Sequence, residues 1–233
     1  MTIAELFEKG GVAMWPLAVL SVLALGTILE RIWFWLGLLS REKETINKIL
    51  DSSNTGNWDR AVQIARETRH RPIGRFLYAP LRRKNPDPET FKLALEAAAE
   101  EELHAMRRGE KILQAAIALA PLLGLLGTVL GLIRSLNGIK LTDLANGSGN
   151  GVTLGISESL ISTATGMVVA ITSVAFYWVF QGLLIKQVNL FRRSGNELEL
   201  LYRERYHRSG RKNAPPSQEE LEPAKPHEET ELL

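Results

Sequence analysis

Three long apolar blocks, separated by strongly charged segments, limit what this chain can fold into. The first block, 11–29, has 19 residues without a charge, and the second, 112–133, has 22 residues with only Gln114 strongly polar. The third, 154–185, exceeds what a perpendicular crossing needs, so it would tilt or project beyond the lipid. Since roughly 20 apolar residues cross about 30 Å of hydrocarbon, the blocks predict three membrane spans.

The end of the first block suits a membrane interface. Glu30 and Arg31 interrupt the apolar run, and the aromatic-rich stretch IWFWLGLL follows. A cleaved signal peptide is the alternative interpretation. It is disfavoured because the preceding AELFEKG is acidic, the run is long, and no small-x-small cleavage site follows.

The distribution of basic residues predicts the orientation of the spans. Most of the 28 Lys and Arg residues lie in the segment 31–111 and from Lys186 onward, which places both in the cytoplasm. The expected fold is therefore all-α: a polytopic membrane protein with three transmembrane helices, two of them extended into the cytoplasm. The predicted division is a periplasmic N-terminus (1–10), a first transmembrane helix with its interfacial segment (11–39), a cytoplasmic helical domain (40–111), a second transmembrane helix (112–133), a periplasmic connector (134–153), a third transmembrane helix (154–185), a cytoplasmic helix (186–208) and a disordered tail (209–233).

The cytoplasmic segment has the composition of helices. DRAVQIARET and the long stretch from Pro88 are rich in strong helix formers, and NPDPET is a good helix start. Since no stop signal follows, we expect one helix to run from Pro88 into the second span. The Pro- and Glu-rich composition from Ser209 is typical of disorder.

Small and polar residues form stripes on the second and third spans. At about 100° per residue, one face of the second span gathers Ala116, Ala120, Gly124, Gly127, Thr128, Gly131 and Ser135. Gly127 and Gly131 have the small-x-x-x-small spacing that lets helix backbones approach closely, and Pro121 is expected to kink the helix. One half of the third span holds Glu158, Ser159, Ser162, Thr163, Thr165, Gly166, Ala170, Thr172 and Ser173. Such faces indicate either tight packing or the lining of a pathway.

Glu158 is the only acidic residue within the apolar blocks. An intramembrane carboxylate is a functional candidate, but a glutamate near a helix start and an interface also has a simpler explanation in the helix dipole. No second carboxylate or histidine accompanies it in the spans, so a partner must supply the titrating group if protons cross here.

Several functional classes are excluded by composition. The chain has no cysteine, and its four histidines are scattered, so we expect no metal site and no cofactor. A net charge of +2 does not indicate nucleic acid, and no nucleophile–base pair or phosphate loop indicates an enzyme.

The stretches APLLGLLGTVLGLIRSL (120–136) and GISESLISTATGMVVAITSVAFYW (155–178) resemble the second- and third-span motifs of the MotA/TolQ/ExbB proton-channel family, most closely ExbB and TolQ. The resemblance implies a bacterial inner-membrane pentamer whose second and third spans surround a pore. The pore would hold the single spans of an ExbD- or TolR-like partner dimer, which carries the proton-binding aspartate and drives a TonB- or TolA-like protein.

Under this resemblance, Thr128 and Thr163 match the pore threonines and Glu158 matches the third-span glutamate. Gly124, Gly127, Gly131, Ser162 and Gly166 would pack the helices. Three alternatives stay open: an ExbB-like role in nutrient uptake, a TolQ-like role in envelope integrity and division, and a helical membrane scaffold that conducts nothing. Coupling to sodium instead of protons also stays open.

Overall fold

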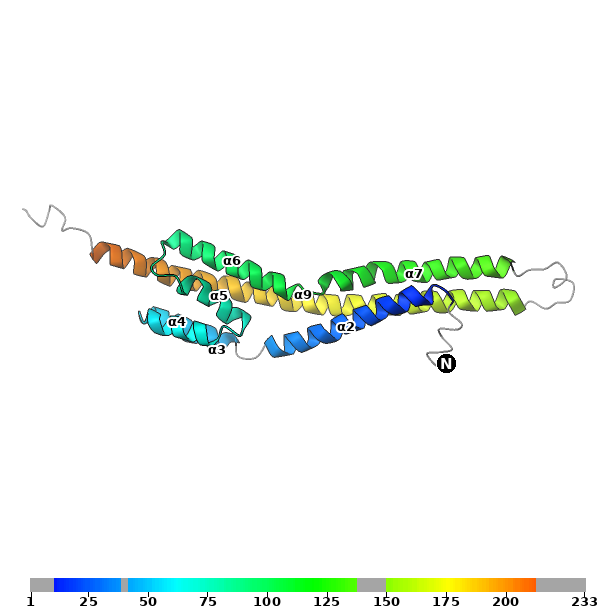
Figure 1. The fold of residues 1–233 in the computed structure, drawn as a ribbon, viewed down its shortest axis with the longest axis horizontal. Helices are drawn as coiled ribbons and strands as arrows, with labels where there is room; N and C mark the ends of the chain where they lie inside the picture. Colours follow the sequence, from blue (N-terminus) through cyan, green and yellow to red (C-terminus); the bar gives the residue numbers. More distant parts are fainter. Residues whose placement is uncertain (1–10, 39–41, 138–149, 213–233) are drawn as a thin grey trace, which may run out of the picture.

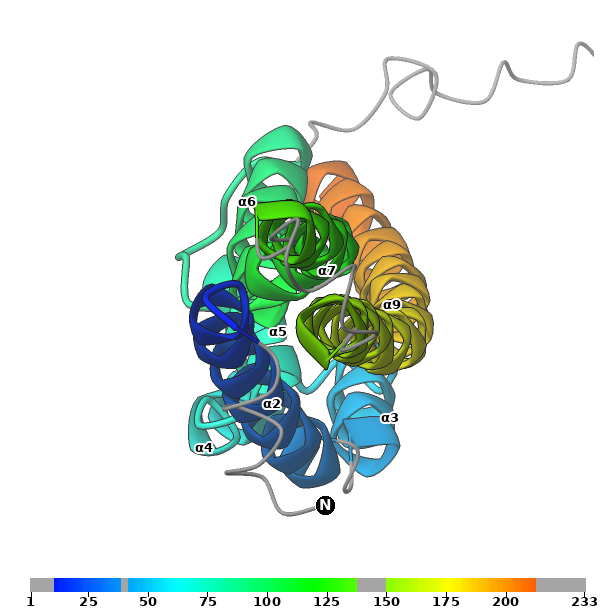
Figure 2. The same ribbon diagram turned by 90° about the vertical axis from the view of Figure 1, so that its right-hand side faces the viewer.

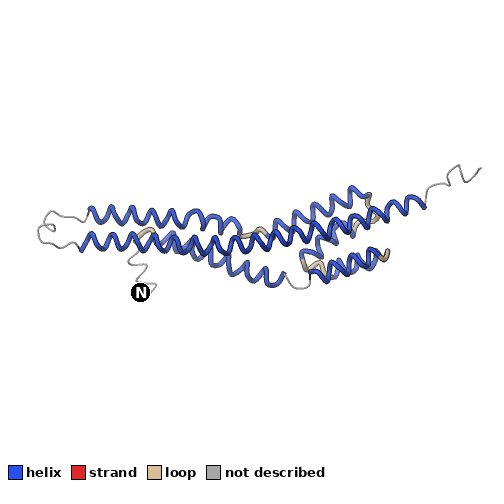
Figure 3. Tube along the Cα trace, turned by 180° about the vertical axis from the view of Figure 1, so that it is seen from behind, coloured by secondary structure: helices blue, strands red, loops and turns tan. Residues whose placement is uncertain are grey.

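Three apolar helices pack side by side along one half of the molecule, and four shorter helices pack along the other half of the longest of them (Figure 1). The computed structural model describes residues 11–38, 42–137 and 150–212. The helices are α2 (Met14–Leu38), α3 (Glu42–Asn54), α4 (Trp58–Glu67), α5 (Pro72–Leu81), α6 (Pro88–Met106), α7 (Glu110–Asn137) and α9 (Asn150–Lys212). These residues form helices, turns and loops and no strand (Figure 3), so the predicted all-α class is confirmed.

Three helical stretches are long and apolar enough to cross a membrane, as predicted. They are α2, α7 and the part of α9 that begins at Ser159. In Figure 2, α7 and the near part of α9 are seen nearly end-on, and α2 runs obliquely beside them. With 63 residues, α9 is about 95 Å long at 1.5 Å per residue, so it extends far beyond any bilayer. The expected extension of the third span is confirmed.

The expectation that one helix runs unbroken from Pro88 into the second span is wrong. The helix α6 ends at Met106, and α7 begins at Glu110 after a turn whose Gly109 has a φ of +80°. An L-residue rarely adopts this conformation, whereas glycine does so readily. The predicted start of α6 is confirmed, since the Asp87 side chain accepts a hydrogen bond from the Thr90 N–H and Pro88 occupies the first turn.

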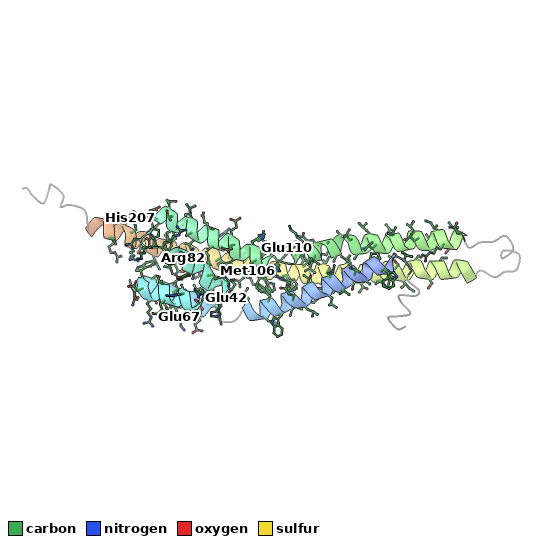
Figure 4. All side chains as sticks on the ribbon, viewed as in Figure 1. Glu42, Glu67, Arg82, Met106, Glu110 and His207 are labelled. Carbon is green, nitrogen blue, oxygen red and sulfur yellow. The ribbon has the colours of Figure 1, made fainter. Side chains whose placement is uncertain are left out.

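A buried arginine from α2 stabilises this break. Arg31, which is 4% exposed, donates from Nη1 to the Met106 carbonyl oxygen at 3.0 Å and from Nε to Glu30 at 2.9 Å. The guanidinium thereby satisfies a carbonyl at the end of α6 that has no partner within its own helix. Figure 4 labels Met106 and Glu110 at this junction, midway along the molecule.

Replacing Gly109 with alanine is expected to destabilise the junction by about 2–4 kcal/mol. The left-handed backbone costs roughly 1–2 kcal/mol for a residue with a Cβ, and that Cβ would lie 2.8 Å from Thr27 Cγ2. Gly56→Ala is the matched control, since Gly56 has a φ of +79° but nothing within 4 Å of a new Cβ. Thermal unfolding should show the larger loss for Gly109→Ala. Equal losses would mean that the contact with Thr27 contributes nothing.

The short helices form a bundle, α3–α6, around the second half of α9. Phe76 of α5 packs edge-on against Phe191, and Phe91 of α6 stacks on Tyr202 at 4.1 Å between ring centroids. Arg75 holds the buried carboxylate of Glu102 through two hydrogen bonds, which join α5 to α6. This core holds the C-terminal half of α9 against the bundle.

Several predictions concern residues outside the described ranges. They are the placement of the N-terminus 1–10, most of the connector 134–153, and most of the tail 209–233.

Candidate functional site

The predicted stripe of small residues on α7 is its buried face. The buried residues of this helix are Leu113, Ala116, Ala120, Gly124, Gly127, Gly131 and Ser135. Thr128 is half-buried, at the edge of the stripe. The stripe packs against α9, while Leu122, Leu125 and Leu136 point outward with exposed fractions between 58% and 69%. The six small residues spaced three and four positions apart therefore form one interface, as periodicity predicts.

Three of the glycines at this interface, Gly124, Gly127 and Gly166, bring the two backbones together. A Cβ at Gly124 would lie 3.0 Å from Thr163 Cα, and a Cβ at Gly166 would lie 2.5 Å from the Ala120 carbonyl oxygen. A Cβ at Gly127 would collide with Ser162 Oγ. At each position a larger residue would collide with the neighbouring helix, so the predicted packing role of these glycines has a steric basis.

Two hydroxyls of α9 reach across to α7 at this point. Thr163 Oγ1 donates to the Gly124 carbonyl oxygen at 3.1 Å, and the fully buried Ser162 Oγ donates to the same oxygen at 3.4 Å. Thr128 Oγ1 instead donates to the Leu125 carbonyl oxygen of its own helix at 2.6 Å. Because the two helices are antiparallel, Thr128 lies about one turn, or ~6 Å, further toward the α7–α9 connection than Gly124 and its partner Thr163.

The outward half of α9 is also as predicted, with one exception. Leu160, Met167, Val168, Ile171 and Trp178 are exposed, and Ser159, Ser162, Gly166, Ala170 and Ser173 are buried. Thr172 was expected among the inward residues but is exposed. It lies about 200° around the helix from Ala170, which puts it on the outer side.

Glu158 is a residue of α9, and the structure describes its backbone but not its side chain. The helix begins at Asn150, eight residues earlier. The favourable effect of a helix dipole on a carboxylate is confined to the first turn, so it does not account for an acid at this position.

Pro121 lies inside α7, which continues past it on both sides. The proline does not end the helix, and a kink there stays a prediction. The α2 helix covers this level of the pair, since Met14 and Leu17 form an apolar cluster with Ala120 and Ala170.

Sequence reasoning missed a polar cluster at the other end of the pair. Glu110 Oε1 accepts hydrogen bonds from Gln181 Nε2 at 2.6 Å, Gln114 Nε2 at 3.2 Å and the Tyr177 hydroxyl at 3.4 Å. Glu110 and Gln114 are four residues apart and therefore on one helix face, which was the available signal. The cluster ties the start of α7 to α9 beside the Arg31 junction.

Comparison with known proteins identifies the family to which the α7–α9 pair belongs. Residues 68–193, more than half of the chain, match the family model described as the MotA/TolQ/ExbB proton channel family. The chain belongs to this family. The matched range includes all of α7 and the part of α9 that packs against it.

Three relatives give the same assignment. An ExbB-like biopolymer transport protein of Synechocystis is 49% identical over 201 residues, which cover 85% of this chain and 78% of the relative. A second Synechocystis ExbB-like protein is 37% identical over 198 residues, which cover 85% of this chain and 93% of the relative. The biopolymer transport protein exbB1 of Vibrio cholerae is 30% identical over 75% of this chain and 77% of its own length.

Family membership confirms the predicted resemblance and makes the chain a multi-pass membrane protein. It also confirms that the chain is a channel and transport protein and not an enzyme.

Proposed function

We propose that this chain is the inner-membrane stator subunit of a proton-motive-force-driven energy transducer. It works with an ExbD-like single-span partner to energise TonB-dependent transport across the outer membrane. The observation that carries the proposal is the α7–α9 interface, where Thr163 donates to the Gly124 carbonyl oxygen and Thr128 lies one turn away at the edge of the same face.

The two hydroxyls suit a partner's carboxyl group. A threonine hydroxyl has one proton to donate and two lone pairs that accept. Thr128 and Thr163 each direct the proton to a backbone carbonyl oxygen, so their lone pairs can accept a hydrogen bond from a protonated carboxyl. The stretches 112–133 and 159–185 carry no Asp or Glu. The proton-binding carboxyl therefore belongs to the partner, and the two threonines stabilise its protonated form.

We place Glu158 at the outer end of the same path. It precedes Ser162 and Thr163 by about one turn of α9, on the side of the α7–α9 connection. In the proposed topology, the N-terminus and the connector face the periplasm, and the α3–α6 bundle and the end of α9 face the cytoplasm. Protons would then reach Glu158 first and the threonines second.

The outward faces of α7 and α9 support assembly of several copies. Side chains such as Leu122, Val168 and Ile171 are at least 60% exposed in the single chain. Within the membrane they must contact lipid or another subunit, and the proposed pentamer buries part of this surface around the partner's spans.

The stoichiometry of the complex tests this proposal. The chain is co-expressed with the ExbD-like protein of the same organism, purified in mild detergent and weighed by native mass spectrometry. The expected mass corresponds to five copies of this chain and two of the partner. A chain that purifies alone, or a complex with a TolR-like protein in preference to the ExbD-like one, would contradict the proposed partner. The second outcome would favour the role in envelope integrity.

A further inference from the structure

A carboxyl group and an amide are buried together where the α3–α6 bundle meets α9. Glu42, at the start of α3, is 5% exposed, and Gln187 of α9 is 3% exposed. Gln187 Nε2 donates to Glu42 Oε2 at 2.7 Å, which links residues 145 positions apart. Both residues lie beyond the predicted membrane spans, and Figure 4 labels Glu42 at the end of the bundle nearest α2.

The other oxygen of each group has no hydrogen-bond partner. Glu42 Oε1 and Gln187 Oε1 are two of the three buried side-chain polar atoms without a partner in the described part of the chain. If Glu42 is ionised, both oxygens are acceptors only, and neither can satisfy the other. If Glu42 is protonated on Oε1, that group becomes a donor and the amide oxygen its acceptor. A single proton therefore satisfies both atoms.

The surroundings favour the protonated form. Burial raises the pKa of Glu42, while the hydrogen bond from Gln187 and the charge of Arg71 act more weakly in the opposite direction. Arg71, the residue directly before α5, is the charged residue that acts on Glu42. On α9, Gln187 is neutral and the adjacent Lys186 is exposed. Desolvation of the carboxylate outweighs this attraction.

We propose that Glu42 is a neutral carboxylic acid in the folded protein and pairs with Gln187 through two hydrogen bonds, forming a pH-sensitive clasp between α3 and α9. The amide N–H donates to one carboxyl oxygen, and the carboxyl O–H donates to the amide oxygen. Ionisation removes the second bond, places two acceptors against each other and releases the start of α3 from α9. The clasp is closed at low pH and loosens as the pH rises through the raised pKa of Glu42.

The pH dependence of stability follows from this arrangement. A carboxyl whose pKa is raised on folding contributes fully below its unfolded pKa, near 4.3, and its contribution is lost as the pH rises through the raised pKa. In that interval the folding equilibrium constant falls about tenfold per pH unit. Above the raised pKa no further loss occurs.

The substitution Glu42→Gln separates the two protonation states. Glutamine mimics the neutral acid, since its amide donates to Gln187 Oε1 and accepts from Gln187 Nε2. In the purified full chain, we expect E42Q and the wild type to have the same thermal midpoint near pH 5. On titration to about pH 9, the midpoint of E42Q should fall less than that of the wild type. E44Q is the matched control, because Glu44 is an exposed residue of the same helix that pairs with Lys48; it should follow the wild type.

Infrared spectroscopy detects the protonated carboxyl of Glu42 directly. A carbonyl stretching band of a protonated carboxyl should be present in the wild type at neutral pH, absent in E42Q and retained in E44Q. The proposal is overturned if E42Q lowers the midpoint equally at every pH, or if wild type and E42Q have the same carboxyl bands. Either result would mean that Glu42 is ionised and that Arg71 or water satisfies it.

Discussion

Gly166→Ala is expected to push α7 away from α9 and to destabilise the protein strongly. The added Cβ would lie 2.5 Å from the Ala120 carbonyl oxygen and 3.3 Å from its carbonyl carbon. These are backbone atoms in a helix, and they cannot turn aside as a flexible side chain does. Overpacking of this kind costs about 1–3 kcal/mol or more, and the carbonyl oxygens and hydroxyls at the interface would lose their geometry as the helices move apart.

The control for Gly166→Ala is on the same helix. Gly182 has nothing within 4 Å of a new Cβ, so Gly182→Ala should keep or slightly raise stability through helix propensity. Thermal unfolding in detergent and the elution volume on size exclusion measure both variants. The packing account fails if Gly166→Ala is as stable as the wild type, or if the two alanines cost the same.

A second pair of substitutions examines the same contact from the other side. Gly127→Ala places its Cβ against Ser162 Oγ and 2.6 Å from Ser162 Cβ. Changing Ser162 to glycine removes both atoms, so the double variant should recover part of the lost stability. Additive losses would show that the two residues do not meet.

Thr163→Val and Thr128→Val are expected to abolish energised transport while the protein remains folded and assembled. Valine keeps the shape of threonine and removes the hydroxyl. The lost structural hydrogen bond of Thr163 costs about 1 kcal/mol. Each valine also leaves the O–H of the partner's protonated carboxyl without its acceptor, which costs about 1–3 kcal/mol, so activity should fall by about tenfold or more.

The serine variants are the controls for the two threonines. Thr163→Ser and Thr128→Ser retain a hydroxyl and should keep most of the activity, measured as energised uptake in a strain that lacks the native gene. Assembly of all four variants with the partner is checked by co-purification. Full activity in both valine variants would remove the proposed role of the hydroxyls.

Much of the fold was predictable because one physical rule dominates it. In lipid, helices associate through close packing, so glycine, alanine and serine at helical spacing identify the contact face without further information. Gly124, Gly127 and Ser135 on α7 and Ser162 and Gly166 on α9 are all buried for this reason.

The parts that sequence reasoning missed depend on contacts between distant residues. The turn between α6 and α7 contains one glycine, Gly109, within a run of good helix formers. A single glycine costs only about 1 kcal/mol in a helix, so it does not by itself predict a break. Arg31, 75 residues away, makes the break favourable by binding the Met106 carbonyl oxygen. The pairing of Glu42 with Gln187 spans 145 residues and has no local signature.

Proton flux into sealed vesicles tests the central claim most directly. The chain is reconstituted with and without its ExbD-like partner, an inside-negative potential is imposed, and internal pH is followed with an enclosed dye. The proposed function predicts flux that requires the partner, is reduced by at least about tenfold in Thr128→Val and Thr163→Val, and is retained in both serine variants. The absence of flux with the partner present, or equal flux in the wild type and both valine variants, would contradict it.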